Sequence, residues 1–196
     1  MSYDTNEHLY VDPATGVFRN KLGARTQTRL DRAEADISYT VIYTLVQGSR
    51  VNRLVFDTRL VSEIHKEIFR DIYTWAGEFR KEVTSKGGST FTHPDNIGPQ
   101  LDEITSSMES DGRLSGKRAL SVDAITVYYD LLNFVHPFRE GNGRAIRTFL
   151  SLLAKKYGYV IAWDKMDKAE NIRVCEWAMF RDTVPMRQMI DGLVAP

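Results

Sequence analysis

The sequence predicts an almost entirely α-helical protein that carries one β-hairpin. Apolar residues recur at intervals of three and four along several separate segments, which is the spacing of amphipathic helices. Only residues 82–92 place β-branched and aromatic residues on both sides of a glycine pair, the pattern of a hairpin. The length of 196 residues fits a single domain that needs no disulfide or structural metal to hold its core.

The N-terminal part is expected to contain an extended segment followed by two helices. Residues 1–25 are rich in turn-forming residues and form the lead-in, while helical spacing covers about 26–48 and then 58–75, where Gly77 ends the second helix. His65 lies beside the apolar stripe of that helix, and its pattern indicates a packing or surface role. The apolar positions of the two helices are Leu30, Ala33, Ile37, Val41, Leu60, Ile64, Ile68 and Ile72.

The hairpin at 82–92 is expected to be the only sheet element. A lone hairpin is marginal in water, so it either leans on the helical body as a flap or offers an edge for pairing; a plain surface loop is the alternative. Pro94 and Asn96 then open a helix, and residues 110–116 form a loop. The buried face of this helix is expected to be Ile97, Leu101, Ile104 and Met108.

A central, buried helix is expected next, with Ser121 as its N-cap and its end at His136, because the residue before a proline is disfavoured in helical conformation. Another helix should begin near Arg144 and end at Gly158. A helix within 164–180 and a short one over 184–193 complete the chain. The apolar positions assigned to these helices are Ile125, Tyr128, Leu132, Val135, Ile146, Phe149, Leu150, Leu153, Ile172, Cys175 and Trp177.

Composition excludes several classes of function. Lys and Arg together number 26, as do Asp and Glu, so no overall field favours direct binding of nucleic acid. Cys175 is the single cysteine, which rules out an internal disulfide and a cysteine-based zinc site and favours a small packing residue. No secretory signal and no apolar run of membrane-spanning length is evident, so a cytoplasmic protein without membrane contact is expected.

The segment FVHPFREGNGRAIRTF concentrates the residues that suggest chemistry. The first turn of a helix has unpaired N–H groups and partial positive charge, and Gly141 and Gly143 let its backbone approach a ligand. Asn142 adds a side-chain donor. Arg144 and Arg147 are three residues apart and therefore share a helix face from which both can bind a polyphosphate. Together these features predict an anion site.

Two further residues of this loop extend the prediction to a reaction. Glu140 places negative charge beside an anion site, which is useful when Mg²⁺ lies between carboxylate and phosphate. His136 titrates near neutral pH and can take a proton from an incoming hydroxyl. Phe138 is expected to anchor the loop in the core. The pattern is that of phosphoryl-type transfer without a covalent protein intermediate.

Each part also has a plain structural explanation. A histidine before proline is often only a helix end, GNG is often only a turn, and an arginine pair is often a solvated face; their coincidence within twelve residues, 136–147, favours function. GNGRAI partly fits the dinucleotide fingerprint, with Asp164 downstream, but Ile146 replaces the third glycine. Repeated strand–helix units and a P-loop are also missing from the sequence, which disfavours that class.

HPFREGNGRAIR resembles the Fic family signature H-x-F-x-[DE]-G-N-G-R-x-x-R at every specified position. Similarity also covers residues 71–80, the hairpin and the N-terminal GVFRNKLG, and so most of the chain. The resemblance implies a helical fold with a flap hairpin over the active site. It implies transfer of AMP from Mg·ATP to a hydroxyl of a target protein, with release of pyrophosphate.

The resemblance also implies roles for individual residues. His136 would activate the target hydroxyl, and Glu140 would hold Mg²⁺ between the α- and β-phosphates. Gly141, Asn142 and Gly143 would form the anion hole. Arg144 would bind the phosphates and Arg147 the γ-phosphate. The flap residues Thr84, Ser85 and Lys86 would pair with an extended target segment, and Asn171 is assigned to the adenine pocket.

Related chemistries remain as alternatives. Doc-type kinases of this fold carry lysine at the position of Gly143, so glycine favours AMP transfer, while phosphocholine-transferring members show that the motif does not fix the donor. A non-catalytic nucleotide-binding module is a further possibility, which the intact motif disfavours.

Many Fic proteins carry an inhibitory helix of pattern [ST]-x-x-x-E-[GN]. The two near matches here, Thr74 to Glu78 and Thr105 to Glu109, lack the final Gly or Asn. The chain therefore resembles the toxin subclass, in which a separate small antitoxin supplies the inhibitory glutamate. DNA gyrase and topoisomerase IV are the targets associated with that subclass.

Overall fold

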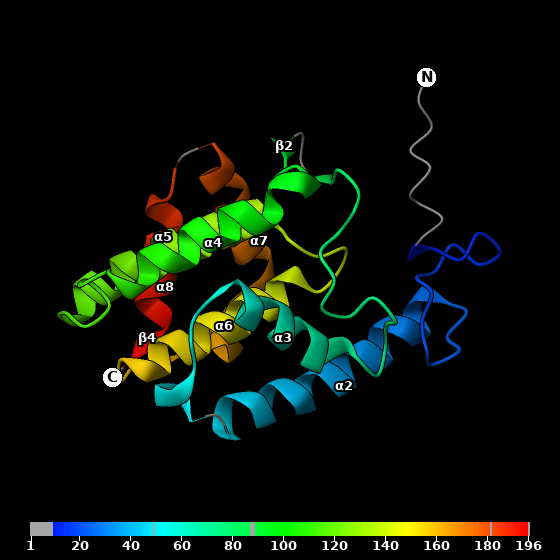
Figure 1. The fold of residues 1–196 in the computed structure, drawn as a ribbon, viewed down its shortest axis with the longest axis horizontal. Coiled ribbons are helices and arrows are strands. Elements are labelled where there is room, and N and C mark those ends of the chain that lie inside the picture. The colour runs from blue at the N-terminus through cyan, green and yellow to red at the C-terminus, as the bar shows by residue number, and fades with distance from the viewer. Residues whose placement is uncertain (1–9, 49, 87–88, 181, 196) are drawn as a thin grey trace.

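The computed structural model describes residues 10–48, 50–86, 89–180 and 182–195 (Figure 1). The first nine residues of the predicted lead-in and the glycine pair of the predicted hairpin turn lie outside the described residues. The helices are α2 (Gln27–Gly48), α3 (Thr58–Phe69), α4 (Ile97–Glu109), α5 (Arg118–Val135), α6 (Asn142–Lys156), α7 (Lys168–Met179) and α8 (Val184–Leu193). Single 3₁₀ turns cover Val51–Arg53, Pro94–Asn96 and Trp163–Lys165, and four short strands are β1 (Ser85–Lys86), β2 (Ser89–Thr90), β3 (Val160–Ile161) and β4 (Val194–Ala195).

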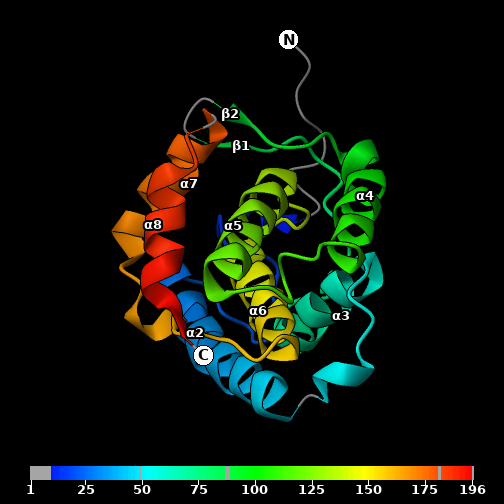
Figure 2. The ribbon, with the colours of Figure 1, turned by 90° about the vertical axis from the view of Figure 1, so that its left-hand side faces the viewer.

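Helices α5 and α6 lie at the centre of the molecule. In Figure 2, α3 and α4 flank them on one side, α7 and α8 on the other, and α2 crosses beneath. Helix α5 contacts α4, α6, α7 and α8, and α6 contacts α2 and α3. Both central helices are rich in buried apolar residues because neighbours cover most of their surface. The predicted helical fold with one hairpin flap is confirmed.

The second helix is shorter than its apolar pattern suggests. The pattern reaches residue 75, yet α3 ends at Phe69. There the Phe69 carbonyl accepts the N–H groups of Ile72 and Tyr73, and the Ile72 carbonyl accepts the N–H of Lys21 from the N-terminal segment. Ile72 is fully buried although it lies outside the helix. The apolar spacing continues past the end of α3 because the residues that follow, such as Ile72, are still buried in the core.

Two helix starts also differ from the expectation. Ser121 is not the N-cap of α5, because the helix begins three residues earlier, at Arg118. Its hydroxyl instead donates to the carbonyl oxygens of Arg113 and Leu114 in the preceding loop. Helix α6 begins at Asn142, two residues before the predicted start, which brings the glycine-rich segment into the helix itself.

Helix α7 packs through small residues rather than through the large apolar ones that were expected. Val174 and Ala178 are buried, one turn apart, against α5 and α8. Ile172 and Trp177 are 36% and 50% exposed, and Cys175 is half-buried. Because α7 is an outer helix with a narrow contact face, its larger side chains lie at the flanks of that face.

The hairpin is confirmed, with Ser85 opposite Thr90 in antiparallel register. It is not the only sheet element, because β3 pairs with β4 and aligns Ile161 with Val194. This second pair joins segments more than thirty residues apart, so no local turn signal announces it. Among the described residues, the structure contains no helix of the length and apolar character needed to cross a membrane.

Candidate active site

The segment between α5 and α6 carries the proposed chemistry, and its shape is set at both ends by unusual backbone. His136 caps α5 in the left-handed conformation, with φ of 48°. Phe138 is fully buried, as predicted, and stacks on the ring of His65 with centroids 3.8 Å apart. His65 is completely buried too; its Nε2 lies 3.0 Å from the Glu140 carbonyl oxygen and its Nδ1 accepts the Gly77 N–H. It therefore positions the loop.

Asn142 holds the loop closed instead of offering its side chain to a ligand. Its Oδ1 accepts the backbone N–H of Phe138 at 2.8 Å, and its Nδ2 donates to the carbonyl of the same residue at 2.7 Å. The side chain is buried. The predicted side-chain donor is therefore occupied within the protein. What Asn142 contributes to an anion site is its backbone N–H in the first turn of α6.

Gly141 is required where α6 begins. Its φ is 80°, and a Cβ at this position would lie 2.3 Å from the Phe69 ring. Gly143 has a different constraint, since a Cβ there would lie 2.9 Å from Nη1 of Arg147. The two glycines thus allow, respectively, close packing of the helix start on α3 and close approach to the arginine.

Arg144 points back toward α2. Its Nη2 lies 2.8 Å from the Glu34 carboxylate and 3.4 Å from that of Glu140, and its guanidinium stacks over the Phe69 ring. Glu34 is buried and also accepts the Tyr73 hydroxyl, whose pKa is raised by burial and by that carboxylate. The arginine is therefore fixed by a buried carboxylate before any phosphate binds.

Glu140 remains partly available at the edge of the site, with 42% of its side chain exposed. Its Oε1 accepts the Gly141 N–H at 2.8 Å, and Oε2 has no partner among the described residues. These residues also contain no cluster of three His, Cys, Asp or Glu side chains able to hold a metal unaided. One carboxylate oxygen beside an anion site fits Mg²⁺ that keeps waters and substrate phosphates as its other ligands.

The geometry of His136 defines which nitrogen can act as a base. Its Nδ1 lies 3.3 Å from the Asn133 carbonyl oxygen, which only accepts, so Nδ1 carries the proton in this contact. Nε2 is then the basic nitrogen. The ring stacks against Phe91, which follows β2, with centroids 3.9 Å apart and planes 9° apart.

Two adjoining cavities bring the motif residues together. The larger, about 830 Å³, is lined by Glu140, Gly141 and Arg144 and by residues of α2. The smaller, about 170 Å³, is lined by His136, Phe91 and Tyr129. Four residues line both cavities: Gly143, Arg147, Asn171 and Ile172.

The flap residues sit beside these cavities rather than in their walls. The Thr84 carbonyl accepts the N–H of Phe91, and Ser85 and Lys86 form β1. Of these hairpin segments, Phe91 reaches the smaller cavity. The predicted flap therefore borders the site through its second stem.

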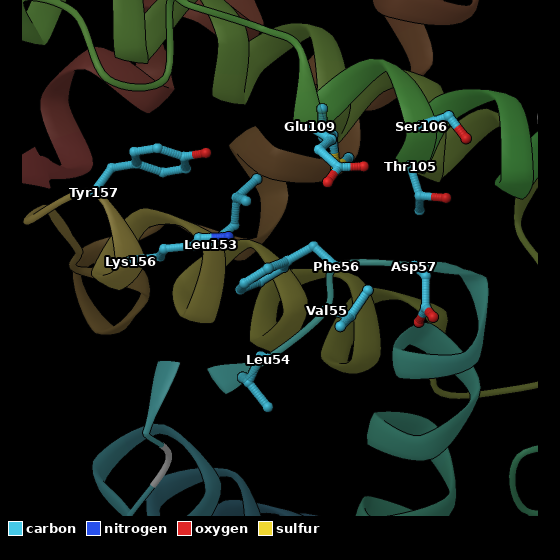
Figure 3. Close-up of a pocket in the computed structure, with 11 residues that line it drawn as sticks. Leu54, Val55, Phe56, Asp57, Thr105, Ser106, Glu109, Leu153, Lys156 and Tyr157 are labelled. Atoms are coloured by element: carbon cyan, nitrogen blue, oxygen red, sulfur yellow. The ribbon is translucent and has the colours of Figure 1, made fainter. Parts of the chain in front are cut away.

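A separate cavity of about 210 Å³ lies between α4, the end of α6 and the segment before α3. Figure 3 shows Thr105 and Glu109 at this cavity together with Phe56 and Lys156. No residue of the 136–147 segment lines it. Glu109 therefore lies at a different cavity from Arg147.

Residues outside the motif complete the site, and sequence reasoning missed them. Glu34 comes from α2, Tyr129 from α5, and Phe91 from the hairpin stem. Arg80, which is buried, binds the carbonyl of His136. Glu34 carried a weak signal, as a charged residue beside the apolar stripe of an amphipathic helix. The others follow only from tertiary contacts.

Comparisons with known proteins identify the family. The Fic/DOC family model matches residues 55–154. The chain is 37% identical over 172 residues to protein adenylyltransferase VbhT of Bartonella schoenbuchensis, covering 87% of this chain and 36% of that protein. It is 31% identical over 160 residues to the probable protein adenylyltransferase Fic of Escherichia coli, covering 81% of this chain and 78% of that protein. It thus spans about a third of the length of VbhT.

Solved structures show the same fold. The Fic domain of a Bartonella effector protein from Bartonella sp. AR 15-3 superimposes with a TM-score of 0.91 at 23% identity, covering 100% of this chain and 95% of that one. BepC from Bartonella tribocorum, solved with bound AMPPNP, gives 0.88 at 20% identity, covering 96% and 97%. The matched segment includes the whole 136–147 loop. The chain belongs to the Fic/DOC family.

Proposed function

We propose that this protein transfers AMP from ATP to a hydroxyl side chain of a target protein. The supporting observation is that Gly143 and Arg147 line both cavities, so the anion-binding start of α6 and the base His136 border one continuous site. The named activity of VbhT and the AMPPNP bound by BepC agree with this proposal.

In the proposed reaction, the target hydroxyl oxygen attacks the α-phosphorus while its proton moves to Nε2 of His136. The bond from the α-phosphorus to the bridging oxygen breaks, and pyrophosphate leaves. The backbone N–H groups of Asn142 and Gly143 lie in the first turn of α6 and bind the phosphate oxygens. The Gly141 N–H donates to Oε1 of Glu140 in this structure and must leave that contact to join them. Arg147, on the same helix face, holds the distal phosphate and so aligns the chain of phosphorus atoms for attack.

Arg144 binds the phosphates with those guanidinium N–H groups that do not donate to Glu34. Glu140 is the residue that would hold Mg²⁺, whose contribution is to neutralise phosphate charge. The partly exposed Glu140 carboxylate and the cavity beside it suit this role.

The adenine base is assigned to the smaller cavity. Asn171 lies in its wall with Oδ1 engaged by the Tyr129 hydroxyl at 2.7 Å, so its amide N–H groups are the ones available to acceptor nitrogens of the base. Tyr129 is buried, which raises its pKa and keeps the hydroxyl a donor. This assignment retains the role predicted for Asn171.

The target segment is assigned to the flap. Among the described residues, β1 pairs with β2 alone, and an unpaired strand edge accepts an additional strand. The edge formed by Thr84, Ser85 and Lys86 would hold an extended target segment by main-chain hydrogen bonds, with little demand on its sequence. Ser85 would supply most of these bonds, because the Thr84 carbonyl already accepts the Phe91 N–H within the hairpin. The specificity for the target must then come from other contacts.

Labelled ATP distinguishes the proposed reaction from its alternatives. Label from the α-phosphate reaches the target in AMP transfer, and label from the γ-phosphate reaches it in a kinase. His136→Ala should reduce transfer by about 10² to 10⁴ while ATP binding persists, since a general base contributes about that factor. Parental transfer in His136→Ala, or label only from the γ-phosphate, would refute the proposal. A non-catalytic module would bind ATP and label nothing.

The physiological role is proposed on the resemblance alone. It is that of a toxin, acting in the cytoplasm where ATP is available, on DNA gyrase or topoisomerase IV. A small antitoxin would supply the inhibitory glutamate that the two near matches do not provide. Incubation with α-labelled ATP and the purified topoisomerases tests the target; an active preparation that labels neither enzyme removes that assignment but leaves AMP transfer in place.

A further inference from the structure

Arg80 lies between α3 and the flap hairpin and is almost completely buried, with 2% of its surface exposed. Arginine is rarely buried so fully unless its N–H groups find acceptors, because its charge persists in proteins. It belongs to neither cavity and to none of the roles assigned above. A buried charge is costly unless its donors are satisfied, so the groups that Arg80 bonds must be identified.

The guanidinium of Arg80 donates to four backbone carbonyl oxygens. Two belong to the end of α5: Nε donates to His136 at 2.8 Å, and Nη2 donates to Val135 at 3.2 Å. Two belong to the stems of the hairpin: Nη1 donates to Glu82 at 2.7 Å, and Nη2 donates to Thr92. One side chain therefore connects both stems of the flap with the residue that carries the base.

These bonds hold the backbone of His136 and the backbone next to Phe91, two residues whose rings stack on each other. Phe91 immediately precedes Thr92, and its ring stacks on that of His136. The backbone of His136 is left-handed, a conformation that a residue with a side chain keeps only when its surroundings impose it. The Arg80 N–H adds a further bond to the Pro137 carbonyl at 2.9 Å. The same residue thus fixes the loop on both sides of the base.

We propose that Arg80 is a positioning residue of the transfer reaction. It keeps the flap and the His136 ring in a fixed position relative to each other. A target segment paired with β1 then presents its hydroxyl at Nε2. This inference rests on the proposed function. The planar fork explains why arginine occupies the position, since a lysine ammonium cannot reach carbonyls on both segments with the same geometry.

Arg80→Lys is the test variant, and Arg118→Lys is its matched control. Arg118 also donates to backbone carbonyls, those of Val194 and Asp191, but at the opposite end of α5 from His136. Both changes replace a fork that bonds backbone carbonyls by an ammonium; Arg118 also pairs with the Asp191 carboxylate and is 40% exposed, so it controls for loss of the carbonyl bonds and not for burial. A comparison of the two separates a general loss of stability from a loss of position.

In Arg80→Lys the kcat for target modification should fall about 100-fold, the effect of displacing a reacting group by roughly 1 Å. ATP affinity, measured by titration calorimetry, should stay within about twofold of the parent because no group that binds the phosphates is altered. Arg118→Lys should keep the parental kcat at temperatures where it is folded. Equal kcat values for the two variants would overturn the inference.

Proton NMR of the His136 ring provides a readout that does not need activity. In the parent, the stacked Phe91 ring should shift the His136 ring signals upfield, and His136→Gln identifies them. Arg80→Lys should remove this shift, and Arg118→Lys should keep it. Retention of the shift in Arg80→Lys would overturn the inference even if the parent transferred no AMP, an outcome that would by itself refute only the proposed function.

If Arg80→Lys does not fold, Phe91→Leu decides the question, because it leaves the four Arg80 acceptors in place and removes only the stacked ring. It should lower kcat at saturating ATP, a condition that removes any effect of Phe91 on adenine binding in the smaller cavity. A Phe91→Leu variant with parental kcat would show that the alignment of flap and base does not matter for transfer, and the inference would fail.

Discussion

Substituting Gly141 by alanine tests the close packing at the start of α6. Two costs add. The φ of 80° is left-handed, which costs a residue with a Cβ about 1–2 kcal/mol. The new Cβ would also lie 2.3 Å from Cζ of Phe69, a fully buried ring, and overpacking of this kind costs about 1–3 kcal/mol. The expected loss in unfolding free energy is therefore about 2–5 kcal/mol.

Gly158→Ala is the matched control. Gly158 has a φ of 83°, but a Cβ there would meet nothing within 4 Å. Only the backbone cost of about 1–2 kcal/mol should appear. Urea unfolding of the two variants measures the difference in unfolding free energy. In thermal unfolding, each kcal/mol lost should lower the melting temperature by about 2–4 °C. Equal losses at the two positions would refute the assignment of the extra cost to Phe69.

The contact with Phe69 can be isolated by a double-mutant cycle. Phe69→Leu in the Gly141→Ala background should recover part of the loss, with a coupling energy of about 0.5–3 kcal/mol. Because the Arg144 guanidinium lies 4.6 Å over the same ring, Gly141→Ala should also weaken ATP binding. Additive energies in the cycle would show that the ring and the glycine do not interact.

Three further results are expected. Gly143→Ala should change the unfolding free energy by no more than about 1 kcal/mol, since glycine is unfavourable within a helix. The new alanine Cβ crowds Arg147, so ATP binding measured by calorimetry should weaken, and an unchanged affinity would contradict this. Asn142→Ala leaves the N–H and carbonyl of Phe138 without their partner and should cost about 2–6 kcal/mol in urea unfolding; a loss below 1 kcal/mol would contradict the bonding described. Burial lowers the pKa of His65 to about 4, so the folded state resists its protonation, and unfolding free energy should fall by about 3 kcal/mol as pH drops from 6.5 to 4. His65→Gln should show a shallower fall over that interval than the parent, and identical slopes would refute the role of this histidine.

Local patterns in the sequence were sufficient for the fold class and for the approximate positions of the seven described helices α2 to α8, and they selected the candidate site. The 136–147 loop is contiguous, so its glycines, its arginines and its terminating proline could be placed without any knowledge of long-range contacts. The apolar face of α4 was predicted in full, because its periodicity reflects only its own geometry. Target, antitoxin and location remain predictions.

Errors arose wherever a contact from elsewhere in the chain changed a local preference. The predicted second helix overran α3 because the N-terminal segment pairs with the Ile72 carbonyl. The pairing of β3 with β4 was missed since its partners are far apart in sequence. Trp177 was expected inside, but α7 has room only for small residues at its contact face.

The sequence by itself determined that a histidine, a carboxylate, two glycines and two arginines share one loop at a helix start, because short-range order follows from residue type and spacing. Only the tertiary structure decided the orientation of these side chains. The pairing of Glu34 with Arg144 and the bonds from Arg80 to His136 join residues more than fifty positions apart. Such contacts exist only once the chain has closed long loops, and no local pattern encodes which distant partner a buried charge will meet.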